Sequence, residues 1–139
     1  YEVIPHGHTS SALQTAEAAR VPGDQLAKSV LLGDDNGYLL AVIPATYRLE
    51  IGRLNQVTAR QLEMIGEAEM LSTFTDCECG AIPPIGDAYG VETVLEADFA
   101  KQDLVYFESG DHEHLIRMPG EAFRKLMDQV PRAHVSQHL

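Results

Sequence analysis

Positively charged residues are scarce in this chain of 139 residues. Ten lysines and arginines stand against 21 aspartates and glutamates, which gives a formal net charge of −11. A chain with this balance is not expected to bind nucleic acid or anionic membranes non-specifically, because it would repel both. The composition therefore argues against a generally basic nucleic-acid-binding protein.

Cysteines and long apolar runs are also few. Cys77 and Cys79 are too close in sequence to join distant parts of the chain, so no disulfide framework is expected, and a reducing cytoplasm is the expected location. The longest apolar run, residues 38–45, is too short to cross a bilayer, and no secretory signal pattern is visible. With 45% hydrophobic and 22% charged residues, we expect one globular domain over residues 1–139.

Hydrophobic patterning predicts a mixed α/β domain. Residues 27–32 and 38–43 are apolar runs around an Asn-Gly loop, so they predict a β-hairpin whose second strand is covered on both faces. The pattern of Phe123, Leu126, Met127 and Val130 predicts a helix that turns these side chains inward. Further strands are expected at 1–5, 61–65, 91–95, 104–107 and 115–118, further helices at about 9–20, 50–59 and 67–74, and a Gly- and Pro-rich loop at 75–90.

Common catalytic motifs are missing: there is no dinucleotide-binding glycine fingerprint, phosphate-binding loop, nucleophile elbow or zinc-protease motif. Two features remain of interest. Lys28 begins an apolar strand, where its ammonium could hold a phosphate, a carbonyl or a terminal carboxylate. From the residues alone, a lysine that only reaches solvent from a sheet edge is the simpler interpretation. The loop 79–86 is rich in proline and small residues, so it is either a rigid oxyanion-binding loop or a plain connection.

Histidines and cysteines occur in pairs at residues 6 and 8, 77 and 79, and 112 and 114. None of these pairs has the usual spacing of zinc ligands, so no metal site is expected. The acidic residues are scattered around turns and predicted solvent faces, which is typical of a solvated surface.

Lys28 and the proline-rich loop together show a resemblance. The chain resembles the YbaK/prolyl-tRNA synthetase-associated domain family over nearly its whole length. The resemblance is carried by residues 3–6, 26–32, 37–44, 79–86, 107–110 and 115–118. It implies a mixed, barrel-like β-sheet surrounded by helices, classed as α+β, and a cytoplasmic aminoacyl-tRNA deacylase that needs no cofactor.

The resemblance also implies site residues. The family's lysine, glycine and proline correspond to Lys28, Gly80 and Pro84, which are the expected catalytic residues. Differences from relatives occur at Ser29, Pro83 and Glu108, and they bear on which amino acid is accepted. The expected substrate-binding residues are Ser29, Val30, Ala81, Ile82, Pro83, Gly86, Ser109 and Gly110.

The expected partner is the CCA end of misacylated tRNA, bound weakly and in a salt-sensitive way because the domain is acidic, with an aminoacyl-tRNA synthetase as a further candidate. No membrane partner is expected. The predicted function is a free-standing trans-editing hydrolase. The alternative is an inactive binding module of the same fold that recognises a nucleotide, small molecule or protein.

Overall fold

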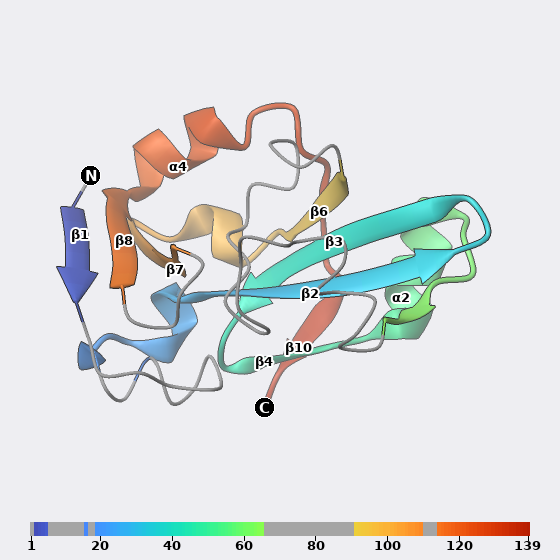
Figure 1. Ribbon diagram of the computed structural model, residues 1–139, viewed down its shortest axis with the longest axis horizontal. Coiled ribbons are helices and arrows are strands. Elements are labelled where there is room, and N and C mark those ends of the chain that lie inside the picture. The colour runs from blue at the N-terminus through green and yellow to red at the C-terminus, as the bar shows by residue number, and fades with distance from the viewer. Residues whose placement is uncertain (1, 6–15, 17–18, 66–90, 110–113) are drawn as a thin grey trace.

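The computed structural model describes residues 2–5, 16, 19–65, 91–109 and 114–139, and the statements below concern these residues (Figure 1). Their strands form sheets of five, three and two strands. The five-stranded sheet has the order β5 (Glu63–Met64), β2 (Ala27–Asp34), β3 (Gly37–Pro44), β6 (Glu92–Glu96) and β9 (Arg132–Ala133). The three-stranded sheet has the order β1 (Glu2–Pro5), β8 (His114–Pro119) and β7 (Leu104–Glu108), and the two-stranded sheet pairs β10 (Ser136–His138) with β4 (Tyr47–Leu49).

The hairpin of β2 and β3 is the central element, and its prediction is confirmed. The two strands pair antiparallel from Ala27 opposite Pro44 to Asp34 opposite Gly37. Gly37 has a φ of +120° at the turn, a backbone conformation that side-chain-bearing residues rarely adopt. The expected burial of β3 on both faces is also confirmed, since residues 39–45 are all buried.

Two helices complete the described fold, together with short 3-10 turns at η1 (Gly23–Gln25) and η3 (Phe99–Lys101). Helix α4 (Gly120–Leu126) covers the larger core, where the Phe123 ring packs edge-on against Phe99 with centroids 5.5 Å apart. Helix α2 (Ile51–Thr58) buries Leu54 at the other end of the hairpin. Figure 1 shows α2 near the turn of the β2–β3 hairpin and α4 beside β8, towards opposite ends of the molecule.

The prediction that Leu126 faces inward is wrong, because its side chain is 50% exposed. The helix ends at Leu126, and the chain then turns so that Met127 and Val130 reach the core from outside the helix. The apolar spacing of Phe123, Leu126, Met127 and Val130 therefore does not come from one continuous helix.

The other predicted strands are confirmed with small shifts of their ends, and the mixed α+β class is confirmed. The short strands β4, β9 and β10 were not predicted. The predicted helix at 67–74, the loop at 75–90 and nearly all of the helix at 9–20 lie outside the described residues. Within the part of the chain that is described, the three sheets do not close into a barrel, so the barrel-like form stays a prediction.

Candidate functional site

Beside the start of β2 lies a short stretch of strand edge that no described strand pairs with, and this unpaired stretch is called the gap below. One parallel bridge, Leu26 to Tyr106, joins β2 to β7. On the same edge β2 next pairs with β5, at Leu32 and Gly33. Between these points, over residues 28–30, this edge of β2 has no strand partner among the residues described. Unpaired main-chain groups on a sheet edge can bind a ligand.

Lys28 lies at this open edge. Side chains alternate between the two faces of a strand, so the Lys28 side chain lies on the same face of the sheet as those of Leu26 and Val30. These two residues pack in the two smaller hydrophobic cores. Lys28 is only partly exposed. Lys28 makes no ion pair with any residue in the described ranges. Its ammonium is thus available for an anionic or carbonyl ligand.

Ser29 presents its side chain to the opposite face of the sheet, the face of Ala27 and Leu31 in the larger core. Its Oγ is buried, and no residue within the described ranges hydrogen-bonds to it. The main chain of Ser29 faces the open edge, because the carbonyl of Leu31, two residues on, accepts the Ile65 N–H on that edge at 3.3 Å. A ligand in the gap would therefore meet Lys28 by its side chain and Ser29 by its main chain.

Strand β7 meets β2 at one end of the gap, through the parallel bridge between Leu26 and Tyr106. Glu108 follows Tyr106 by two residues and is the last residue of β7. Glu108 is 4% exposed and shares a face with Tyr106.

Ser109 follows Glu108 and is exposed. Its N–H and its hydroxyl both donate to the carbonyl of His114, each at 3.2 Å. These bonds tie the end of β7 to the start of β8.

Of the expected site residues, Lys28, Ser29 and Val30 lie on the unpaired stretch of β2, with Val30 half-buried on the Lys28 face. Ser109 follows the end of β7, the strand that is bridged to β2 at Leu26 and Tyr106. Gly80, Ala81, Ile82, Pro83, Pro84, Gly86 and Gly110 lie outside the described residues, as do His6, His8, Cys77, Cys79 and His112.

Sequence reasoning missed a cluster of Glu96, Asp98 and His134, whose potential metal-binding atoms lie within 4.8 Å of one another. Glu96 is fully buried. Its Oε1 accepts the N–H groups of Val135 and Ser136 at 3.0 Å each and the Ser136 hydroxyl at 2.8 Å. The carboxylate is therefore already used to anchor the C-terminal strands to β6, which gives the cluster a structural role.

A second ionic network lies at the tip of the hairpin, where a cavity of about 440 Å³ opens. Arg60 binds both carboxylate oxygens of Asp34, at 2.9 and 2.7 Å, and also bonds Glu92 at 2.9 Å and the Gly37 carbonyl at 2.9 Å. The Arg60 guanidinium lowers the pKa of Asp34 to about 2. Because this cation is fully occupied, the network holds the hairpin to α2 rather than offering a free charge.

Comparison with known families now gives the class of protein. The chain belongs to the aminoacyl-tRNA editing domain family, whose model matches residues 6–126. The family membership predicted from the sequence is thereby confirmed. No curated protein is similar enough to the chain to count as a match.

Solved structures share the fold. A protein proposed to be a trans-editing enzyme for prolyl-tRNA synthetase is 20% identical with a TM-score of 0.84, and the alignment covers 98% of this chain and 86% of that one. A scaffold protein used for computational epitope grafting is also 20% identical with a TM-score of 0.84, covering 99% and 87%. A protein from Marinobacter aquaeolei VT8, proposed to act in signal transduction, is 25% identical with a TM-score of 0.73. That alignment covers 84% of this chain but 26% of that protein.

In the part of the chain that is described, no helix is both long and apolar enough to span a bilayer.

Proposed function

We propose that the protein is a free-standing, cytoplasmic aminoacyl-tRNA deacylase, built as one domain over residues 1–139, that hydrolyses the ester of misacylated tRNA. The match to the editing domain family over residues 6–126 carries this proposal. The position of Lys28 supports it, since the lysine that the family resemblance marks as catalytic stands at an open strand edge rather than in an ion pair within the described residues.

The reaction needs modest chemistry from the protein. An aminoacyl ester is already activated, so positioning and stabilisation of the oxyanion that forms when water attacks the carbonyl can supply most of the rate. Lys28 binds the 3′-terminal phosphate or orients the ester. Gly80 and Pro84 shape a loop whose backbone N–H groups, with those of Ala81 and Ile82, stabilise the oxyanion.

The remaining proposed contacts set specificity. Val30, Ile82 and Pro83 form walls that select the amino acid by size, because a hydrophobic pocket excludes groups too large for it. The further substrate contacts are Ser29, Gly86, Ser109 and Gly110. The tRNA is bound weakly through its CCA end, and a synthetase is a candidate partner that presents it.

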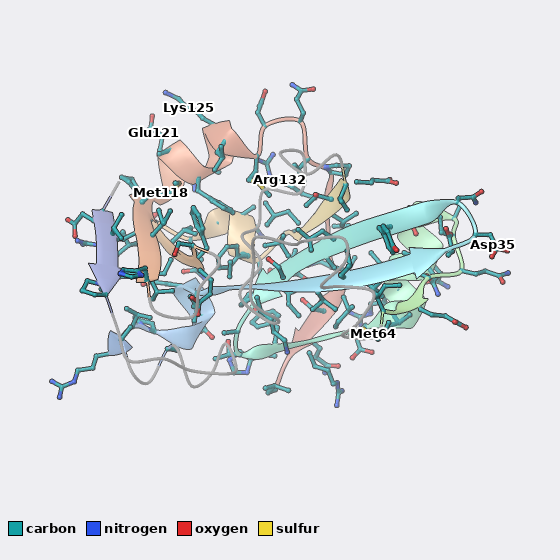
Figure 2. All side chains as sticks on the ribbon, in the orientation of Figure 1. Asp35, Met64, Met118, Glu121, Lys125 and Arg132 are labelled. Carbon is teal, nitrogen blue, oxygen red and sulfur yellow. The ribbon has the colours of Figure 1, made fainter. Side chains whose placement is uncertain are left out.

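The test is deacylation of tRNAs carrying alanine, serine, threonine or cysteine, including the proline tRNA, by wild type and Lys28→Ala. We expect hydrolysis of at least one ester and a loss of about 100-fold or more in Lys28→Ala, comparable to the loss of a charge-stabilising group elsewhere. Lys125→Ala is the matched control, because Lys125 projects from α4 on the outside of the molecule (Figure 2). Hydrolysis that is equal in wild type and Lys28→Ala would overturn the role of Lys28. Absence of turnover across the panel would favour the inactive binding module.

A further inference from the structure

The side chains of Glu96, Asp98 and His134 form a cluster that the proposed reaction does not use. Their potential metal-binding atoms lie within 4.8 Å of one another. We propose that these three side chains bind a divalent metal ion, for which Zn²⁺ is the best fit, and that this ion holds the C-terminal segment against β6. The metal site does not depend on the proposed deacylase activity, and either can be wrong without the other.

The main chain brings the three residues together from two distant parts of the sequence. Strands β6 and β9 pair in parallel with Glu96 opposite Ala133, and the Ala97 N–H donates to the Ala133 carbonyl at 2.9 Å. His134 follows Ala133 directly, while Asp98 follows Glu96 by two residues. The pairing of the strands therefore sets His134 beside the two carboxylates.

The distances between the donor atoms suit one shared metal ion. Nδ1 of His134 lies 3.4 Å from Oε2 of Glu96 and 3.8 Å from Oδ1 of Asp98. Two donors that bind zinc at about 2.0–2.2 Å in a tetrahedral arrangement lie roughly 3.3–3.6 Å apart, so the exposed His134 ring needs to move only slightly. One imidazole nitrogen and two carboxylate oxygens are donors that zinc accepts, with water at the fourth position. Because the side chains of His134 and Asp98 are 62% and 41% exposed, an ion can reach the cluster from solvent.

Neighbouring donors hold the two carboxylates in place and leave an oxygen of each for the metal. Oε1 of Glu96 accepts the hydrogen bonds that anchor the C-terminal strands, while Oε2 accepts the Asp98 N–H at 2.8 Å. A carboxylate oxygen has two lone pairs, so Oε2 can bind a metal as well. The Tyr47 hydroxyl donates to Oδ2 of Asp98 at 3.1 Å, and the other oxygen, Oδ1, is the one nearest His134. Hydrogen bonds of this kind orient the ligands of a metal before it binds.

The charge of the cluster also favours a bound cation. Glu96 is fully buried, and buried carboxylates are usually paired with a cation or bound to a metal. In the described ranges, neither Glu96 nor Asp98 has a lysine or arginine as an ion-pair partner, and the basic side chain that both approach is that of His134. A divalent ion would balance both negative charges and bind the imidazole at the same time.

The experiment measures zinc binding and stability in protein that carries no affinity tag and has been stripped of metal with a chelator. Isothermal titration calorimetry with ZnCl₂ gives the Kd, and thermal unfolding with and without Zn²⁺ gives the change in Tm. We expect wild type to bind Zn²⁺ and its Tm to rise by about 5 °C or more at saturating Zn²⁺, because an ion that binds the folded state alone stabilises it. In His134→Ala, we expect the Kd to rise by about 100-fold or more and most of the rise in Tm to be lost, since one of the three protein ligands is removed.

His138→Ala is the matched control, because His138 is an exposed histidine of the same C-terminal segment that lies 3.3 Å from Asp24 and outside the cluster. It should keep the wild-type Kd and the wild-type rise in Tm. Both histidine side chains are more than half exposed, so both variants are expected to fold. A wild-type Tm that does not respond to Zn²⁺ would overturn the metal site. A response to Zn²⁺ that is the same in His134→Ala as in wild type would overturn it too.

Discussion

Two carboxylates of this acidic chain stabilise its fold through the hydrogen bonds that they accept. Asp34 is bound at both oxygens by Arg60, and Glu96 is enclosed by main-chain donors of the C-terminal segment. Each of them therefore stabilises the fold through donors that would otherwise lose their partner. Their contributions to stability can be measured separately, that of Asp34 through its dependence on pH and that of Glu96 through substitution at moderate pH.

Asp34 makes stability depend on acidity. Its folded-state pKa is lowered from 3.8 to about 2 by Arg60, so its contribution is complete above pH 4 and is lost as the pH falls toward 2. We expect Asp34→Asn to be less stable than wild type at pH 7 and to show less loss of stability between pH 4 and pH 2. Urea unfolding across this range measures the difference, with exposed Asp35→Asn as control (Figure 2). Identical pH profiles for wild type and Asp34→Asn would contradict the assignment.

Glu96 should matter at all moderate pH values. Replacing it with alanine leaves the N–H groups of Val135 and Ser136 without their acceptor in a buried place. We expect Glu96→Ala to lower the free energy of unfolding by about 2–4 kcal/mol. Chemical denaturation measures this loss, and hydrogen exchange of the two amides should rise. A loss below about 0.5 kcal/mol, the range of ordinary surface changes, would show that the cluster is not an anchor.

At the scale of elements, the sequence was most informative where a pattern was both strong and local. The β2–β3 hairpin was predictable because two apolar runs flank an Asn-Gly turn. The β4–β10 and β6–β9 pairings were not predictable. Strands β4, β9 and β10 are only two or three residues long, and each pairing joins residues more than 30 positions apart in the sequence. The inward prediction for Leu126 failed for a related reason, since periodicity does not show where a helix ends.

Helix α4 depends on close contact at its first residue. A Cβ on Gly120 would collide with the main-chain carbonyl of Gln102, which cannot move aside easily. We expect Gly120→Ala to destabilise the protein by about 1–3 kcal/mol, as overpacking does in cores. Gly52→Ala in helix α2 is the control, because nothing lies within 4 Å of its Cβ position and alanine favours helix formation. The melting temperature should therefore fall for Gly120→Ala and stay level or rise for Gly52→Ala.

At the scale of the whole molecule, the charge and the proposed partner oppose each other. A chain with a net charge of −11 repels tRNA at long range, so binding must rely on a few local contacts. The sequence pointed to Lys28 as one of these contacts, and the structure places it on a strand edge that none of the described strands covers. The sequence could not show that β7 lies beside the start of β2, because that follows from a single parallel bridge between Leu26 and Tyr106, which are distant in sequence.

This balance predicts weak tRNA binding. We expect the affinity for uncharged tRNA to fall as salt rises from 50 to 200 mM, with a shallow logarithmic slope of about −1 to −3 because few phosphates are contacted. Fluorescence titration of labelled tRNA at several salt concentrations measures the slope. Tight binding that does not respond to salt would contradict a surface with few cations.

The most direct test of the account is the single-turnover rate at which excess protein deacylates a misacylated tRNA that it accepts, measured for wild type and Lys28→Ala. We expect rapid hydrolysis by wild type and a rate near the spontaneous one for Lys28→Ala, while Lys125→Ala keeps the wild-type rate. Equal rates for wild type and Lys28→Ala would show that the editing site is not beside Lys28.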